Sequence, residues 1–399
     1  MLLGAGFSAP FGMPLVVELN QIAEAIPTPE VPTAVGSEGS RVSAARLLHR
    51  ALRSEYGAQI NFELALHAIE SLLSYSAADT FDDRLADVHQ VMRAFTDPSP
   101  RWTTLVHYDV LKRLRESMLT EIVRLFNARE RKAWTALTPT SSIANRSSQF
   151  IDALSQAFSL RCFTLNYDTL IDRHLNWNDG FPNENGAAFS RSRFNKKLSV
   201  SEPFLFHLHG STQFGFTETG AIGKFRDSAD ALASYEQARS FKPNQAGELN
   251  DAGPIISGLR KLDKLNSTPY GYYYSAFINS IIAEPRLLVI GYGFKDAHLN
   301  YWLGQHRAIH RSERRVVLIR KSRDLARAIG TANADNEEPG KLYRSAAEEL
   351  LWRQAEAKSV EWKSSTRLSY MQSAQLLVVL SGYPLNGLGL RLVRDHLAS

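Results

Sequence analysis

Residues 1–9, with the sequence MLLGAGFSA, decide the fold class of this chain. An apolar run leads into the turn Gly4-Ala5-Gly6, and an apolar helical pattern follows at 15–19. This order matches the dinucleotide fingerprint Gly-x-Gly-x-x-Gly/Ala, with Ala9 in the third place. In that fingerprint Gly4 permits a tight turn, Gly6 permits close approach of a pyrophosphate, and the pyrophosphate lies at a helix N-terminus. An ordinary glycine turn has the same pattern, so the motif alone leaves both interpretations open.

Further along the chain, four apolar runs without alternation have the character of strands. Buried parallel strands have this pattern, because helices cover both faces of their sheet. The runs lie at 161–165 (RCFTL), 204–208 (FLFHL), 286–290 (RLLVI) and 315–319 (RVVLI). We therefore predict an α/β fold with a Rossmann-like, mostly parallel sheet. No acidic residue follows a second strand at the distance expected for a dehydrogenase.

The remaining segments predict the domain organisation. Helical spacing dominates residues 40–160, which are too many for one crossover between strands, so we predict a large all-helical insertion subdomain. The sheet core would then comprise residues 1–30 and 161–320. Residues 211–270 contain several turn signals and are expected to be largely irregular. Residues 337–399 form a C-terminal extension of unknown role.

Composition restricts the class of protein. The 399 residues are 44% hydrophobic and 22% charged, which allows a full core and excludes disorder as the main character. A net charge of +5 is mild for this length, so we expect no direct nucleic-acid binding. Cys162 is the one cysteine, which excludes an internal disulfide and a four-cysteine zinc site. Without a long apolar run or a signal-peptide pattern, we expect a cytoplasmic protein that does not bind membranes.

The first of the four runs continues into FTLNYDTLI at 163–171, where two polar residues follow the strand. Asn166 or Asp168 could cap a helix that begins near Thr169, since both types are good N-caps. Both also stand at the carboxyl edge of a buried strand, where open α/β sheets bind ligands. An amide there can hold a water or a ribose hydroxyl, and a carboxylate can accept a hydrogen bond from a carboxamide.

Two histidines alternate in FHLHGS at 206–211, so that both side chains are expected on one side. His207 and His209 could be satisfied core histidines, a His-x-His metal pair, or a catalytic base with its neighbour. A metal needs at least one more ligand, and no His, Asp or Glu lies at close spacing, so we predict no metal. Gly210 ends the strand and leaves His209 at the rim, where an imidazole suits a general base.

The third apolar run ends in LVIGYGFKD at 288–296, another strand that leads into a glycine turn. Gly291 and Gly293 permit close approach of the backbone to a ligand. A tight turn between strand and helix would need the same glycines. Both interpretations remain open at this point.

Taken together, these turns resemble the sirtuin family, especially its bacterial sirtuin-like branch in antiphage defence. The resemblance rests on four segments in the same order as in sirtuins: GAGFSAPFGMP at 4–14, TLNYDTL at 164–170, LHGS at 208–211 and GYGFKD at 291–296. It covers residues 1–19 and about 161–320. The helical block and the tail lie outside it.

The resemblance implies roles for individual residues around NAD. Asn166 would hold the nicotinamide ribose or the attacking water, Asp168 the carboxamide, and His209 would be the base. Gly291 and Asp296 would lie near the adenosine. The first turn would bind the phosphates and ribose through four residues: Gly4, Ala5, Gly6 and Ser8.

Two departures from deacylating sirtuins matter for the expected activity. The four-cysteine zinc module is impossible here, and Gly12-Met13-Pro14 is followed by Leu15 rather than by Asp-Phe-Arg. The resemblance therefore implies an NAD⁺ glycohydrolase, with NAD as substrate and no metal, that depletes cellular NAD during infection. Alternatives are an NAD-dependent protein deacylase or ADP-ribosyltransferase, or a non-catalytic sensor of NAD or ADP-ribose. Expected partners are further copies of the chain in a homo-oligomer and a HerA-type ATPase or similar defence companion.

Overall fold

The structure is a computed structural model, and every structural statement concerns the residues that it describes. These are 1–25, 30–32, 41–57, 61–81, 108–136, 142–173, 177–199, 202–238, 255–256, 267–294, 296–319, 361–364, 369–372, 376–379 and 387–399. The helical patterns that the sequence contains at 324–329 and 342–357 lie outside the described residues.

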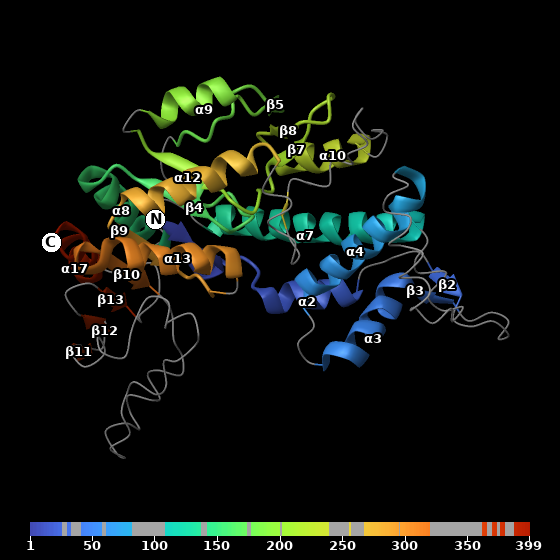
Figure 1. Ribbon diagram of the computed structural model, residues 1–399, viewed down its shortest axis with the longest axis horizontal. Helices are drawn as coiled ribbons and strands as arrows, with labels where there is room; N and C mark the ends of the chain where they lie inside the picture. Colours follow the sequence, from blue (N-terminus) through green and yellow to red (C-terminus); the bar gives the residue numbers. More distant parts are fainter. Residues whose placement is uncertain are drawn as a thin grey trace, which may run out of the picture.

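The described strands form an eight-stranded sheet in the order β11-β12-β13-β10-β9-β1-β4-β6 (Figure 1). The strands from β13 to β6 run parallel to one another, and β11 and β12 add an antiparallel edge. This confirms the predicted α/β fold with a mostly parallel, Rossmann-like sheet. The strands are β1 (Leu2–Leu3), β4 (Arg161–Thr164), β6 (Phe204–His207), β9 (Arg286–Ile290), β10 (Arg315–Ile319), β11 (Glu361–Ser364), β12 (Ser369–Gln372) and β13 (Leu376–Val379).

Both faces of the sheet are buried, because successive residues of each strand belong to different hydrophobic clusters. Leu288 and Ile290 face a cluster that includes α8 (Ser142–Ala157) and α17 (Gly387–Ala398). Leu287 and Val289 face the other cluster, which is rich in aromatic rings and covered by α12 (Tyr270–Ala283) and α13 (Ala297–His310). Burial on both sides explains why successive interior positions of these strands are apolar.

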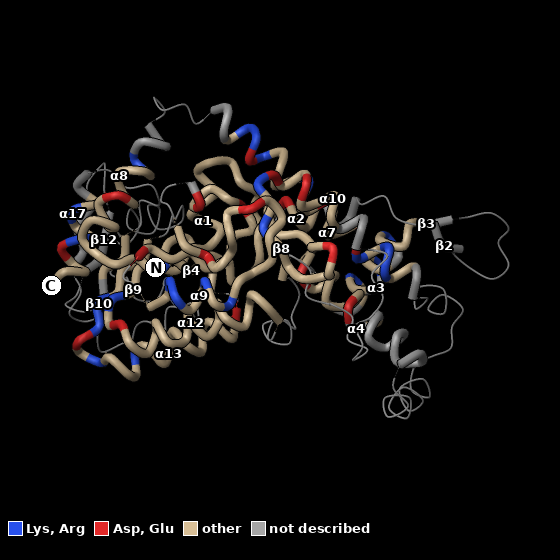
Figure 2. The backbone as a smooth tube through the Cα atoms, turned by 90° about the horizontal axis from the view of Figure 1, so that it is seen from above, with Lys and Arg blue, Asp and Glu red and all other residues tan. Residues whose placement is uncertain are grey.

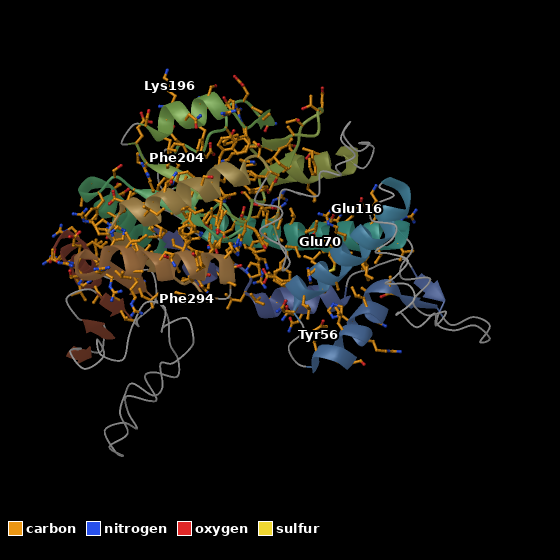
Figure 3. The ribbon with its side chains drawn as sticks, viewed as in Figure 1. Tyr56, Glu70, Glu116, Lys196, Phe204 and Phe294 are labelled. Carbon is orange, nitrogen blue, oxygen red and sulfur yellow. The ribbon has the colours of Figure 1, made fainter. Side chains whose placement is uncertain are left out.

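A block of helices lies beyond the sheet, at the right of Figure 1. The longest, α7, packs against α4, and α2 and α3 complete the block. Figure 3 labels Glu70 on α4 and Glu116 on α7, and an ion pair of 3.3 Å joins Glu70 to Arg115 across this interface. The helices are α2 (Val16–Ala25), α3 (Ala44–Tyr56), α4 (Phe62–Phe81) and α7 (Tyr108–Ala136). A short strand, β3 (Arg41–Ser43), stands at the start of the range predicted as a helical insertion and pairs with β2 (Glu30–Pro32).

Two segments contain more regular structure than the sequence predicts. Residues 211–270 are not irregular throughout, because they contain β7 (Phe214–Phe216), β8 (Ile222–Lys224) and α10 (Ser228–Ala238). These strands are too short to give a periodic signal, and they form a small sheet with β5 (Ala187–Ala188). In the C-terminal extension, β13 pairs with β10 and α17 packs on both strands, so this segment completes the main sheet.

Basic and acidic residues both occur along the described chain. Figure 2 shows short basic and acidic stretches near one another at several places along the backbone, with long uncharged stretches between them. Among the described helices, none combines the length and the apolar character needed to cross a membrane.

The glycine turns after β1 and β9 are in direct backbone contact. The Gly4 N–H donates to the Ile290 carbonyl and the Gly6 N–H to the Gly291 carbonyl, both at 2.9 Å. A Cβ atom on Gly6 would lie 2.7 Å from the Cα of Gly291, closer than real Cβ contacts allow. Gly291 itself has φ of +62°, a backbone conformation that is strained for residues with a side chain. The two turns therefore need glycine because they pack against each other.

This contact predicts that Gly291→Ala destabilises the fold. A Cβ there would meet the backbone of Gly6 and Phe7 and would also strain the left-handed φ, which alone costs about 1–3 kcal/mol. Gly293→Ala is the matched control, because no heavy atom of the described residues lies within 4 Å of a Cβ at Gly293. We expect the control to change the free energy of unfolding by less than about 0.5 kcal/mol. Urea unfolding of the two variants measures the difference, and equal midpoints would contradict the interpretation.

Candidate functional site

The carboxyl ends of β1, β4, β6 and β9 lie at one edge of the sheet, and the predicted site residues follow these ends. Asn166 joins the first two turns, because its Nδ2 donates to the Gly4 carbonyl at 3.0 Å and to the Ser8 Oγ at 2.9 Å. Ser8 in turn hydrogen-bonds the Asp168 side chain. All three side chains are buried. The structure thus brings together residues that the sequence separates by more than 150 positions.

The turn that follows β4, residues 165–168, is called the asparagine turn. It does not lead directly into an α-helix, although one interpretation of the sequence predicted a helix there. Only a 3₁₀ turn, Ile171–Arg173, follows in the described residues. The Asp168 Oδ1 accepts from the Leu170 N–H two residues on, which is the short turn that Asp favours over a helix. Asp168 and Asn166 are therefore not N-caps of a helix at Thr169.

Burial raises the pKa of the Asp168 carboxyl from 3.8 to about 6, although the hydrogen bonds from Ser8 and Leu170 oppose the shift. A carboxyl that titrates near neutrality can hold a proton or accept a hydrogen bond. Asp168 is 2% exposed and lies beside the first glycine turn, to which Ser8 connects it.

The helix that follows the first glycine turn is also shorter than the dinucleotide fingerprint implies. It is α1 (Ala5–Ser8), which continues into the 3₁₀ turn Ala9–Phe11, and the predicted long helix begins only at Val16. A single turn sums few peptide dipoles, so it adds little field for a pyrophosphate.

The two histidines reach different partners, so they do not share a site. The strand β6 ends at His207, which is why the expected alternation stops there. The His207 Nε2 lies 3.2 Å from the Asp172 Oδ2, in a buried network that Lys224 extends to Asp179. Lys224 and His207 lower the pKa of Asp172 against the opposing effect of burial. This network ties β6 to β8, and His207 is one of its structural members.

His209 lies in the turn after β6 and is 4% exposed. Its backbone carbonyl accepts from the Ile256 N–H at 2.8 Å, which fixes the turn. Its Nε2 lies 3.8 Å from the Oδ1 of Asp296, the N-cap residue of α13. Asp296, which the resemblance places near the adenosine, thus lies beside His209, the expected base.

Glu130 on α7 is a site residue that the sequence reasoning missed. Its Oε1 accepts from the Thr169 N–H at 2.8 Å and from the Thr212 Oγ1 at 3.3 Å, and its Oε2 accepts from the Thr169 Oγ1 at 3.1 Å. Thr169 follows the asparagine turn, and Thr212 follows the turn at residues 208–211, which contains His209. One carboxyl from the helical block therefore holds two of the site turns, and no pattern around residue 130 signals this.

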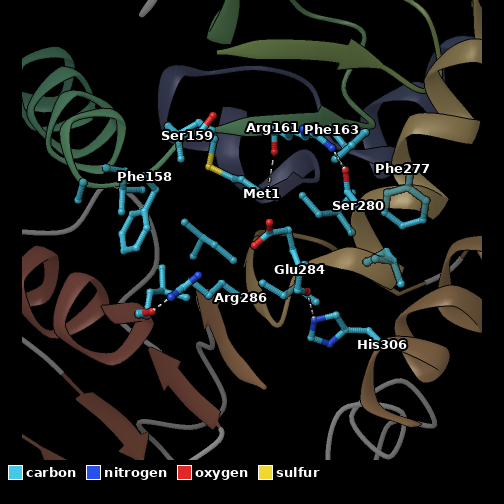
Figure 4. Close-up of a pocket in the computed structure, with 18 of the residues that line it drawn as sticks. Met1, Phe158, Ser159, Arg161, Phe163, Phe277, Ser280, Glu284, Arg286 and His306 are labelled. Carbon is cyan, nitrogen blue, oxygen red and sulfur yellow. Dashed lines mark hydrogen bonds between the residues drawn. The ribbon is translucent and has the colours of Figure 1, made fainter. Parts of the chain in front are cut away.

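A cavity of about 630 Å³ lies at the opposite edge, near the amino ends of β1, β4 and β9 (Figure 4). Met1, Arg161, Glu284 and Arg286 are among its lining residues, and the Met1 amino group donates to the Arg161 carbonyl at 2.7 Å. None of the sequence-predicted site residues lines this cavity. We therefore place the candidate site at the carboxyl edge of the sheet, where the turns lie, and not in this cavity.

Comparison with known protein families gives one match. The family described as SIR2-like domain matches residues 161–340. The matched range contains Asn166, His209 and Gly291, and SIR2-like domains use NAD. No curated protein matches the chain.

Glu130 gives the stability of the folded protein a defined pH dependence. Burial and the nearby Asp168 charge raise the pKa of Glu130 from 4.5 to about 7, against the hydrogen bonds from Thr169. Because the folded state holds this proton to higher pH than the unfolded state, the free energy of unfolding falls as pH rises from about 4.5 to 7. The loss is roughly 3 kcal/mol for a shift of this size.

Glu130→Gln tests this, because the amide oxygen can still accept from Thr169 but cannot titrate. We expect the free energy of unfolding of the wild type, relative to Glu130→Gln, to decline across that pH window. Urea unfolding at a series of pH values measures the difference. Parallel curves for the two proteins would show that Glu130 does not titrate in this way.

Proposed function

We propose that this chain is an NAD⁺ glycohydrolase that releases nicotinamide and ADP-ribose. The observation that carries the proposal is the hydrogen bonding of Asn166 to Gly4 and Ser8, at the carboxyl edge of a sheet that carries a SIR2-like domain. Open α/β sheets bind their ligands at this edge.

The orientation of Asn166 defines what its side chain can offer a substrate. Both N–H bonds of the amide are directed to protein acceptors, the Gly4 carbonyl and the Ser8 hydroxyl. The amide oxygen is then the group available to accept a hydrogen bond from a ribose hydroxyl or from water. A fixed acceptor of this kind also stabilises positive charge that develops nearby, without reorganising during the reaction.

The proposed reaction cleaves the bond between C1′ of the ribose and the nicotinamide nitrogen. The bonding electron pair moves to the nicotinamide ring and neutralises its charge, leaving an oxocarbenium-like C1′. The oxygen of a water molecule forms the new bond to C1′, and His209 accepts the proton that this water loses. Asp168 accepts a hydrogen bond from the carboxamide NH₂, and Gly291 borders the adenosine side. Asp296, 3.8 Å from His209, lies on the side of the reacting ribose.

We extend the proposal to a role in antiphage defence, in which the enzyme depletes cellular NAD in the cytoplasm after infection. Activity of this kind has to remain silent in a healthy cell. We propose that homo-oligomerisation or a HerA-type ATPase companion supplies the activation.

Asn166→Ala and His209→Ala test the proposal directly. We expect each to slow nicotinamide release from NAD by at least about 100-fold, the usual loss for a positioned polar or basic group. The measurement is nicotinamide formation by the purified full chain, with and without candidate activators.

Lys196→Ala is the control, because Lys196 is exposed on α9 (Arg191–Leu198), which lies away from the helical block at the top of Figure 3. It should retain wild-type activity, and unfolding temperatures establish that all variants are folded. Wild-type rates in both site variants would remove these residues from the mechanism. Nicotinamide release that requires an acyl-lysine peptide or a protein acceptor would instead indicate a deacylase or a transferase. Binding of NAD without turnover under every condition would indicate a sensor.

A further inference from the structure

Three potential metal ligands converge beside the candidate site. The side chains of His209, Asp296 and His298 each offer one ligand atom, and these atoms lie within 4.8 Å of one another. His209 is buried, while Asp296 and His298 are partly exposed. The cluster is therefore accessible to an ion from solvent and has one ligand held firmly inside the protein.

The ligands come from backbone segments that the fold fixes. His209 lies in the turn after β6, where Gly210 adopts φ of +89° and Ile256 binds the His209 carbonyl. Asp296 and His298 lie at the start of α13, after β9. Asp296 makes no capping hydrogen bond with its own helix, and its carboxylate instead lies towards His209. The two segments are thus held at the same edge of the sheet.

We propose that His209, Asp296 and His298 bind a divalent transition metal, with Zn²⁺ as the best match. Two imidazoles and one carboxylate are a ligand set that Zn²⁺ accepts, with water in the fourth position. Zn²⁺ bonds of about 2.0–2.1 Å place tetrahedral ligand atoms about 3.4 Å apart, so the cluster closes with side-chain movements of about 1 Å. The sequence alone predicts no metal here, because Asp296 and His298 follow β9 whereas His209 follows β6. The three ligands are therefore not closely spaced along the chain.

The site shares His209 with the proposed hydrolysis, and this consequence rests on the proposed function. A metal bound to His209 occupies the nitrogen that would accept the proton from water. Metal binding and base catalysis by this imidazole therefore exclude each other. The metal acts as an inhibitor that holds the enzyme silent.

The binding test uses the purified full chain without a polyhistidine tag, titrated with Co²⁺ as a spectroscopic probe. We expect a visible absorption band typical of low-coordinate Co²⁺ that saturates at one ion per chain and disappears when Zn²⁺ is added. His298→Ala should weaken Co²⁺ binding by at least about tenfold, because it removes one ligand. His310→Ala is the matched control on the same helix, since its ring contacts the Ile281 carbonyl. It should bind Co²⁺ like the wild type.

Absence of the band in the wild type would overturn the proposal, and so would equal binding by wild type and His298→Ala. These results do not depend on NAD, so they decide the metal site even if the chain hydrolyses nothing. The activity arm then measures nicotinamide release: Zn²⁺ should inhibit the wild type, and a chelator should restore it. His298→Ala should hydrolyse NAD at the wild-type rate without metal and resist Zn²⁺ at least about tenfold better. Stimulation by Zn²⁺ would overturn the inhibitory role.

Discussion

The contact between the two glycine turns is the constraint on which the rest of the site depends. Strand β1 has only two residues, so its own ladder bonds to β4 and β9 are few. The bonds from Gly4 to Ile290 and from Gly6 to Gly291 continue this ladder beyond the strand. They set where the Gly4 carbonyl lies, and that carbonyl orients the amide of Asn166. Backbone packing that only glycine allows thus determines the position of the principal polar group.

The sequence was sufficient to predict the fold class, because burial on both faces leaves a direct record in apolar strands such as 286–290 and 315–319. It also identified Asn166, Asp168 and His209 as polar residues after strand ends, since parallel strands place their carboxyl ends at one edge. The sequence did not reveal why glycine is needed at Gly6 and Gly291. Gly6 has the pattern of a residue that approaches a pyrophosphate, whereas the structure shows it against Gly291, a partner that no local pattern can specify.

The residues that sequence reasoning missed are those whose roles arise only from tertiary contact. Glu130 stands in the charged run RERK at 129–132, which is typical of a solvated helix face. In the structure it is buried against Thr169 and Thr212, where a carboxyl is costly unless it is hydrogen-bonded. Lys224 likewise lies in a segment expected to be irregular, yet it neutralises the buried Asp172. Buried charges of this kind are recognisable only once their partners are placed.

Helix α7 connects the helical block to the site through two adjacent residues. Arg129 pairs with Glu18 on α2, which follows α1 and the 3₁₀ turn in the chain, and Glu130 holds Thr169 and Thr212. A movement of α7 must either carry these segments along or leave the Glu130 carboxyl buried without its donors, which costs about 1–3 kcal/mol for each neutral group left unsatisfied. The helical block and the turns that present Asn166 and His209 are therefore mechanically coupled. Through these bonds, α7 is the physical route by which the activation proposed above would reach the site.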